Sequence, residues 1–164
     1  MREARVRKTD FVRLLLSHGA DPNISTSKCT CYPIHAACSG LHYDVVRLLL
    51  EYDADVNVPD ESGETALHYA VTLHDTDSDN SSALAQLLLD AGADVNTASD
   101  KGETPLYIAC SKGLESTVMK MLECGAKVDG IDRKKLPLHA ACRNEHVSVV
   151  QLLLANGANP NLQE

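Results

Sequence analysis

The sequence predicts an all-α solenoid of about five stacked helical units. Three observations support this fold class: a short turn motif recurs at nearly constant spacing, an apolar helical stripe precedes each copy, and a second motif opens most units. Units of this size cannot bury both faces of their helices alone, so they must stack into a continuous core. The 164 residues are therefore expected to form one repeat domain.

The turn motif is of the Gly-Ala-Asp-Val-Asn type. Successive copies begin 34, 39, 33 and 32 residues apart. Glycine at the first place is typical of a left-handed cap at the end of a helix. An aspartate in that place should cost up to about 1 kcal/mol if the left-handed geometry is kept. The five copies begin at Gly19, Asp53, Gly92, Gly125 and Gly157.

The opening motif is of the Thr-Pro-Leu-His type. A proline in the first turn starts a short helix, because its missing N–H is not needed there. The small residues that follow allow close packing against a neighbouring helix. The apolar stripe upstream of each turn motif then predicts a second helix in the same unit. Copies of the opening motif occupy residues 32–37, 65–70, 104–109 and 136–141.

Both motifs resemble those of the ankyrin repeat, and the resemblance covers essentially the whole chain. It implies stacked ankyrin repeats, each with a β-turn finger followed by two antiparallel helices. The first unit lacks its finger, and its basic first helix is expected to act as an N-terminal cap. By register the repeats are 1–23 (partial), 24–57, 58–96 with an insertion at 76–81, 97–129 and 130–161.

Histidines at one repeat position invite a catalytic or metal interpretation, but their register favours a structural one. His35, His68 and His139 share the position, and Tyr107 replaces them once. In the family this histidine hydrogen-bonds the backbone and braces the finger. We therefore assign these imidazoles to the fold.

Three cysteines also share one repeat position. Cys38, Cys110 and Cys142 each lie three residues after the motif histidine or tyrosine, where Val71 stands in the third unit. Because valine and cysteine exchange as small buried groups, these thiols are expected in the core.

Nothing in the sequence indicates an enzyme or a cofactor. There is no phosphate-binding glycine loop and no Ser-His-Asp arrangement. Cys29 and Cys31 come nearest to zinc-ligand spacing but lack a second half. Residues 75–82 resemble the start of a calcium loop, yet the glycine and glutamate it needs are missing, so we interpret them as an insertion.

The net charge of −8 is unevenly distributed, since residues 51–100 hold twelve acidic side chains and no lysine or arginine. The acidic balance argues against nucleic-acid binding. No apolar run approaches the roughly 20 residues of a membrane span, and the N-terminus lacks the apolar stretch of a secretory signal. We therefore expect an intracellular protein, cytoplasmic or nuclear, with neither nucleic acid nor membrane as a partner.

The resemblance implies a monomeric protein–protein interaction module, part of a larger scaffold or regulator. In the family, contacts come from the fingers and the exposed ends of the first helices on the concave face. The acidic middle fingers predict that a basic part of a protein or peptide partner lies on Glu61, Glu64, Asp100 and Glu103. The full predicted contact set is Glu61, Ser62, Glu64, Tyr69, Thr72, Leu73, Asp100, Lys101, Glu103, Tyr107, Ser111, Lys112, Arg133, Lys135 and Arg143.

Four residues are candidate apolar anchors for that partner, although some of them must belong to the core: Tyr69, Leu73, Tyr107 and Ile108. An alternative function is substrate recognition within a ubiquitin ligase of the ankyrin and SOCS-box kind, which only sequence beyond Glu164 would distinguish.

Two asparagines are candidate modification sites. Asn57 and Asn96 each end an Asp-Val-Asn motif with a leucine eight residues earlier. This pattern resembles the sites that an asparaginyl hydroxylase modifies in ankyrin repeats.

Overall fold

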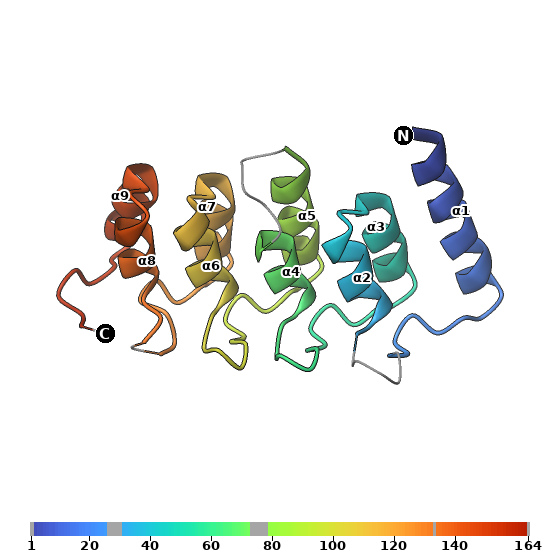
Figure 1. Ribbon diagram of the computed structural model, residues 1–164, viewed down its shortest axis with the longest axis horizontal. Coiled ribbons are helices and arrows are strands. Elements are labelled where there is room, and N and C mark those ends of the chain that lie inside the picture. Colours follow the sequence, from blue (N-terminus) through green and yellow to red (C-terminus); the bar gives the residue numbers. More distant parts are fainter. Residues whose placement is uncertain (1, 26–30, 73–78, 133, 164) are drawn as a thin grey trace.

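A computed structural model describes residues 2–25, 31–72, 79–132 and 134–163, without the side chains of 2–6 and 79–81. Within these ranges the chain forms nine helices and no strand. The helices stand side by side in one elongated row, with the two ends of the chain at opposite ends of the row (Figure 1).

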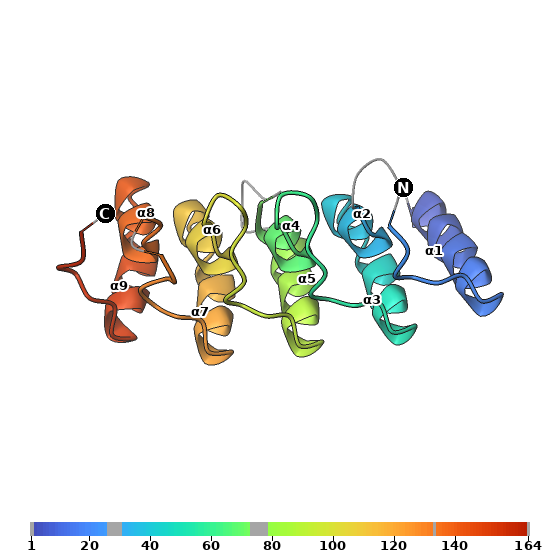
Figure 2. The same ribbon diagram turned by 90° about the horizontal axis from the view of Figure 1, so that it is seen from below.

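One single helix is followed by four helix pairs. Figure 2 shows α2, α4, α6 and α8 in one row and α3, α5, α7 and α9 in a second. Each helix packs on its neighbour in its own row, and α1 packs on α3. This confirms the predicted all-helical solenoid. The helices are α1 (Arg2–Ser17), α2 (Pro33–Ser39), α3 (Tyr43–Glu51), α4 (Ala66–Thr72), α5 (Asp79–Asp90), α6 (Pro105–Lys112), α7 (Glu115–Glu123), α8 (Pro137–Arg143) and α9 (Val147–Ala155).

The core follows the repeat register along the whole row. Ile34, Leu67, Leu106 and Leu138 fill the same place in the opening motif, and none is more than 7% exposed. Prolines stand in the first turn of α2, α6 and α8, as predicted. Residues 76–78 of the predicted insertion lie outside the described residues, and 79–81 belong to α5.

The three cysteines at the shared repeat position differ in burial. Cys38 and Cys110 are fully buried, and desolvation raises the pKa of the Cys38 thiol to about 12, so it stays protonated. Cys142 is exposed, so the prediction that it is buried was wrong. Cys38 and Cys110 lie on helices that pack against a following first helix, α4 or α8. Within the described chain no such helix follows α8.

Side chains of one unit hold the turn of the next through what we call the asparagine ladder: Asn23, Asn57, Asn96 and Asp129. The Asn57 amide donates to the Gly92 carbonyl at 3.2 Å and accepts from the Asp94 N–H at 2.8 Å. Asn23 and Asn96 make the same two contacts one unit earlier and one unit later. The Asp129 carboxylate accepts from the Asn159 N–H. Adjacent units are therefore joined by side chain to backbone bonds.

The residues at the cap position adopt the predicted left-handed conformation. The backbone angle φ is 87° at Gly92 and 60° at Asp53, which replaces the glycine. We expect Asp53→Gly to raise the free energy of unfolding by about 0.5–1 kcal/mol, because glycine lacks the steric penalty of that region. Urea denaturation measures it. Gly92→Asp is the matched control: a Cβ there meets nothing within 4 Å, so a loss of similar size should reflect backbone strain alone. Stabilisation by both changes would contradict this account.

Candidate protein-interaction surface

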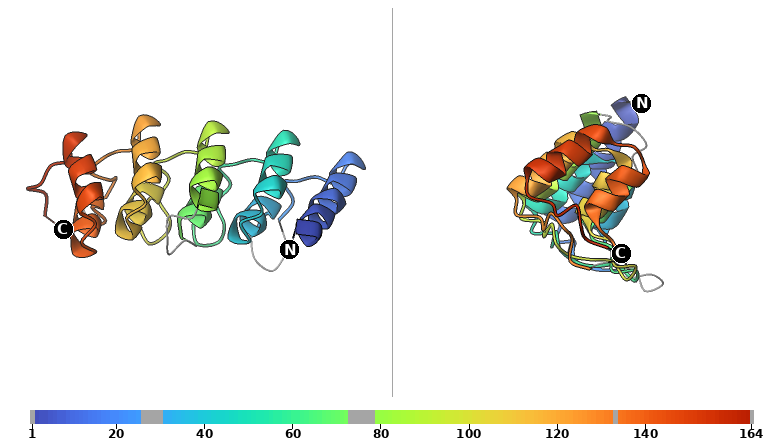
Figure 3. Two further views of the ribbon diagram at one scale, coloured as in Figure 1. Left: turned by 90° about the horizontal axis from the view of Figure 1, so that it is seen from above. Right: turned by 90° about the vertical axis from the view of Figure 1, so that its left-hand side faces the viewer.

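The segments leading into α4, α6 and α8 extend to one side of the helices as the fingers (Figures 1 and 3). In the finger at 60–64, the Asp60 N–H donates to the Glu64 carbonyl at 2.9 Å. The finger at 99–103 closes in the same way, Ser99 N–H to Glu103 carbonyl. A bond of 2.8 Å from the Asp100 N–H to the Ser62 carbonyl joins them. The acidic fingers are therefore held as one surface.

Asp60 organises the first of these fingers, although the sequence prediction omitted it. Its Oδ1 accepts from the backbone N–H groups of Ser62 and Glu64, both at 2.8 Å, and its Oδ2 accepts from the Tyr69 hydroxyl at 2.7 Å. Partial burial alone would raise the pKa of Asp60, but these bonds bring it below its ordinary value. The Asp-x-x-Gly turn pattern at 60–63 is the signal that could have identified it.

Two of the three motif histidines, His35 and His68, brace the fingers as the resemblance implied. The imidazole Nε2 of His35 donates to the Val58 carbonyl, and that of His68 donates to the Glu103 carbonyl, each at 3.0 Å. The His35 ring also stacks on Tyr69, with ring centroids 5.3 Å apart. Tyr69 is thus fixed between His35 and Asp60. Burial, followed by the bond to Asp60, raises the pKa of its hydroxyl, which stays a donor.

Glu103 already has a cation beside it within the chain. The Lys135 Nζ lies 2.8 Å from the Glu103 carboxylate and 5.1 Å from the centroid of the Tyr107 ring. The bond to Glu103 raises the pKa of Lys135. Two predicted partner contacts therefore bind each other, and Glu103 is less suited to a basic partner than the sequence indicated.

Glu64 stands one repeat before Glu103 at the same finger position and has a different environment. Desolvation and then the nearby Asp60 charge raise its pKa; Lys101 lowers it and Glu103 raises it further. Among the described side chains, no lysine or arginine forms an ion pair with its carboxylate. A carboxylate with a raised pKa gains most from a cation brought to it.

The remaining predicted contacts differ in exposure and in the bonds that they make. Lys112 of α6 donates to the Thr72 carbonyl of α4, and the Ser111 hydroxyl bonds to its own helix. Ile108 is 8% exposed and belongs to the core. Leu73 and Arg133 lie outside the described residues. Glu61, Ser62, Thr72, Asp100, Lys101 and Arg143 are exposed, whereas Glu64, Tyr69, Glu103, Tyr107, Ser111, Lys112 and Lys135 are half-buried.

The described part of the chain has neither a cluster of metal-ligating side chains nor a helix able to span a membrane. No cluster of three or more His, Cys, Asp or Glu side chains there has the geometry to hold a metal ion. No helix there is both long and apolar enough to cross a lipid bilayer.

The sequence is similar to proteins whose repeats have the same helix pairs and fingers as those described above. The family model of ankyrin repeats matches residues 1–78 and 73–164. The chain is 33% identical over 155 residues to an ankyrin repeat protein of fowlpox virus, which covers 93% of this chain and 16% of that protein. It is 35% identical over 133 residues to the B-cell lymphoma 3 protein homolog of Mus musculus, covering 80% and 29%.

Similarity extends to neurogenic locus notch homolog protein 1 of Danio rerio, 32% identical over 156 residues, covering 94% of this chain and 6% of that protein. The chain thus spans less than a third of each of these relatives. The repeat motifs, the helix pairs with their fingers and the family match lead to one conclusion: this chain belongs to the ankyrin-repeat family, whose repeats are generally non-enzymatic protein-interaction modules.

Proposed function

We propose that this chain binds an extended or helical protein segment on its concave finger and helix face, as part of a larger intracellular scaffold or regulator. The basic part of that segment lies on the finger at 60–64 and the adjoining Asp100. Tyr69 provides a rigid aromatic surface beside it.

The environment of Glu64 carries the proposal. At the next repeat, Lys135 shows how a cation fits this surface: it contacts the carboxylate of Glu103 and lies over the ring of Tyr107. At Glu64 the finger offers a carboxylate with which no described lysine or arginine forms an ion pair, although the nearby Lys101 lowers its pKa. A lysine or arginine of the partner would form the ion pair with that carboxylate. The cation–π contact is not repeated there, because the buried His68 stands at the position of Tyr107.

The test compares partners captured by the wild-type chain with those captured by a triple variant, Glu61→Lys, Glu64→Lys and Asp100→Lys. Glu103 is left unchanged because Lys135 occupies it. We expect partners of the finger face to bind at least about tenfold more weakly to the variant and to lose most of their salt dependence.

Glu115→Lys supplies the control, since it reverses one exposed acidic charge on α7, in the second row of helices. Partner lists and salt responses that stay the same for the wild type and the triple variant would remove the finger face from the proposal.

The asparagines support a secondary proposal that an asparaginyl hydroxylase modifies Asn57 and Asn96. Asn57 is exposed and Asn96 half-buried, so Asn57 is the more accessible. Intact-mass analysis after co-expression would show the gain of one oxygen atom, and an unchanged mass would count against it.

A further inference from the structure

A second surface, separate from the fingers, lies at the end of the molecule that holds α1 (Figure 1). A groove of about 270 Å³ runs between α1 and α2, with α3 as its floor. Val12 of α1, Ala36 and Ala37 of α2, and Leu49 of α3 form its apolar walls, and Lys8 and His42 stand at its rim. We name this the α1–α2 groove.

The first helices α2, α4, α6 and α8 form one row, and the α1–α2 groove lies at the position that would precede α2 in this row (Figure 2). In α6 and α8, the faces turned to the preceding first helix are covered: Ile108 is 8% exposed and Ala140 is 2% exposed. Ala36 holds the same register position in α2 and is exposed. Figure 2 shows α1 as a single helix beside the pair α2 and α3. The groove therefore has the shape of the site that a first helix occupies elsewhere in the stack.

The helices that fill this place in other units show what fits it. Towards the following helix they present small side chains at one register position, and these are fully buried: Cys38, Val71 and Cys110. Small aliphatic groups let the backbones approach closely, which a bulky face would prevent. A binding helix must therefore carry alanine-sized or valine-sized side chains on its buried face.

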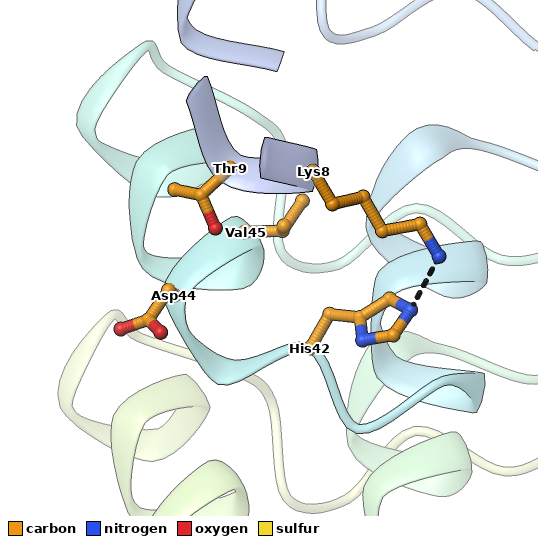
Figure 4. Close-up of a pocket in the computed structure, with 5 residues that line it drawn as sticks. All are labelled: Lys8, Thr9, His42, Asp44 and Val45. Carbon is orange, nitrogen blue, oxygen red and sulfur yellow. Dashed lines mark hydrogen bonds between the residues drawn. The ribbon is translucent and has the colours of Figure 1, made fainter. Parts of the chain in front are cut away.

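The rim adds a charge requirement. Lys8 reaches from α1 and its Nζ donates to the Nε2 of His42 at 2.8 Å, while Asp44 points away from this pair (Figure 4). An ammonium has three N–H donors, so one bond to His42 leaves capacity for a carboxylate. Among the described residues that line the groove, Lys8 is the one that carries a formal charge at neutral pH. The preceding Arg7 adds a second exposed positive charge to α1.

We propose that the α1–α2 groove binds a short amphipathic helix of a partner protein, with small aliphatic side chains on its buried face and an acidic residue against Lys8. Two observations support it: the groove continues an interface that already joins α2, α4, α6 and α8, and its rim is positive. The charge requirement is opposite to that of the fingers, so the two surfaces select different segments.

The test uses the 164-residue chain with ¹⁵N labelling and a defined probe. The probe is a capped, alanine-based helical peptide of about 14 residues, since shorter isolated helices are marginal. It carries two valines on one face and two glutamates one turn apart at the end of that face. We expect amide shifts to change at Val12, Ala36, Ala37 and His42, and the binding to weaken as salt rises.

Variants locate the site. Ala36→Arg fills the groove and should weaken binding at least about tenfold, and Lys8→Glu should do the same by reversing the rim charge. Ser39→Arg is the matched control, because Ser39 is exposed on the same helix but does not line the groove. Circular dichroism confirms that the variants are folded.

Three results would overturn the proposal. The first is the absence of shift changes at millimolar peptide. The second is equal binding by a scrambled peptide of the same composition, or by the Ala36→Arg variant. The third is concentration-dependent shifts at the groove without any peptide, which would assign it to a second copy of the chain.

Discussion

Acidification from pH 7.5 to 5.5 is expected to lower the free energy of unfolding by up to about 1.4 kcal/mol for each of two buried histidines. Burial lowers the pKa of both His35 and His68. The bonds to Val58 and Glu103 and the Asp60 charge act in the opposite direction without overcoming it. Below the unfolded pKa of about 6.5, the unfolded chain therefore binds more protons than the folded one. The free energy of unfolding must therefore decrease as the pH is lowered through that window.

The hydrogen bonds at His68 explain the sign. Its Nε2 donates to the Glu103 carbonyl, so the Nδ1 of the neutral ring must accept. Both the Thr65 N–H, at 3.1 Å, and the Thr65 hydroxyl, at 2.9 Å, point to that Nδ1. A proton on Nδ1 would face the Thr65 N–H directly. The geometry thus favours the neutral imidazole independently of burial.

Urea denaturation across this pH range measures the effect. His68→Gln removes one titrating group and should flatten the dependence by about half, although it lowers stability at pH 7.5 because the Thr65 N–H loses its acceptor. His18→Gln is the control, since His18 is exposed at the end of α1. A dependence that His18→Gln removes and His68→Gln leaves intact would contradict the assignment.

Asn57→Ala is expected to lower the free energy of unfolding by about 2 kcal/mol, because it removes two hydrogen bonds between neighbouring units. Among the described residues of its own unit, no bond to the Asn57 side chain is present that could compensate for the bonds to Gly92 and Asp94. Asn57→Asp should cost about half as much, since an aspartate keeps the bond from the Asp94 N–H and loses only the donor to Gly92. Asp129 makes this single bond naturally. Thermal and urea unfolding provide the measurement.

Asn161 offers the matched control for the ladder. It ends the last turn motif, and the structure gives its side chain no contact with another unit. Asn161→Ala should therefore change stability by no more than about 0.5 kcal/mol. Equal losses at Asn57 and Asn161 would show that the asparagine acts within its own turn and that the ladder contributes nothing.

The sequence predicted the fold well because the repeat imposes the same local rule several times. The caps at Gly92 and Asp53, the prolines that open helices and the buried Leu67 and Leu106 all follow from register alone. Cys142 shows where register fails: burial depends on the following helix, and a residue in the last unit has none in the described chain.

The surface was less predictable, because side chains from different units meet there. Neither the pairing of Glu103 with Lys135 nor the bond from the Tyr69 hydroxyl to Asp60 can be inferred from charge along the chain, since each depends on contacts in space. The α1–α2 groove lies where, in the described residues, α1 stands as a single helix beside α2 and α3, and the periodicity of the sequence does not show such a groove.

The asparagine ladder has a consequence for how such a chain can change over time. Each rung joins a side chain to backbone atoms, and backbone atoms are the same in every unit. A duplicated or deleted unit therefore meets neighbours that still offer a matching carbonyl and N–H. The bonds of the ladder can therefore re-form after recombination without compensating substitutions at the ladder positions, while the finger surfaces remain free to diverge.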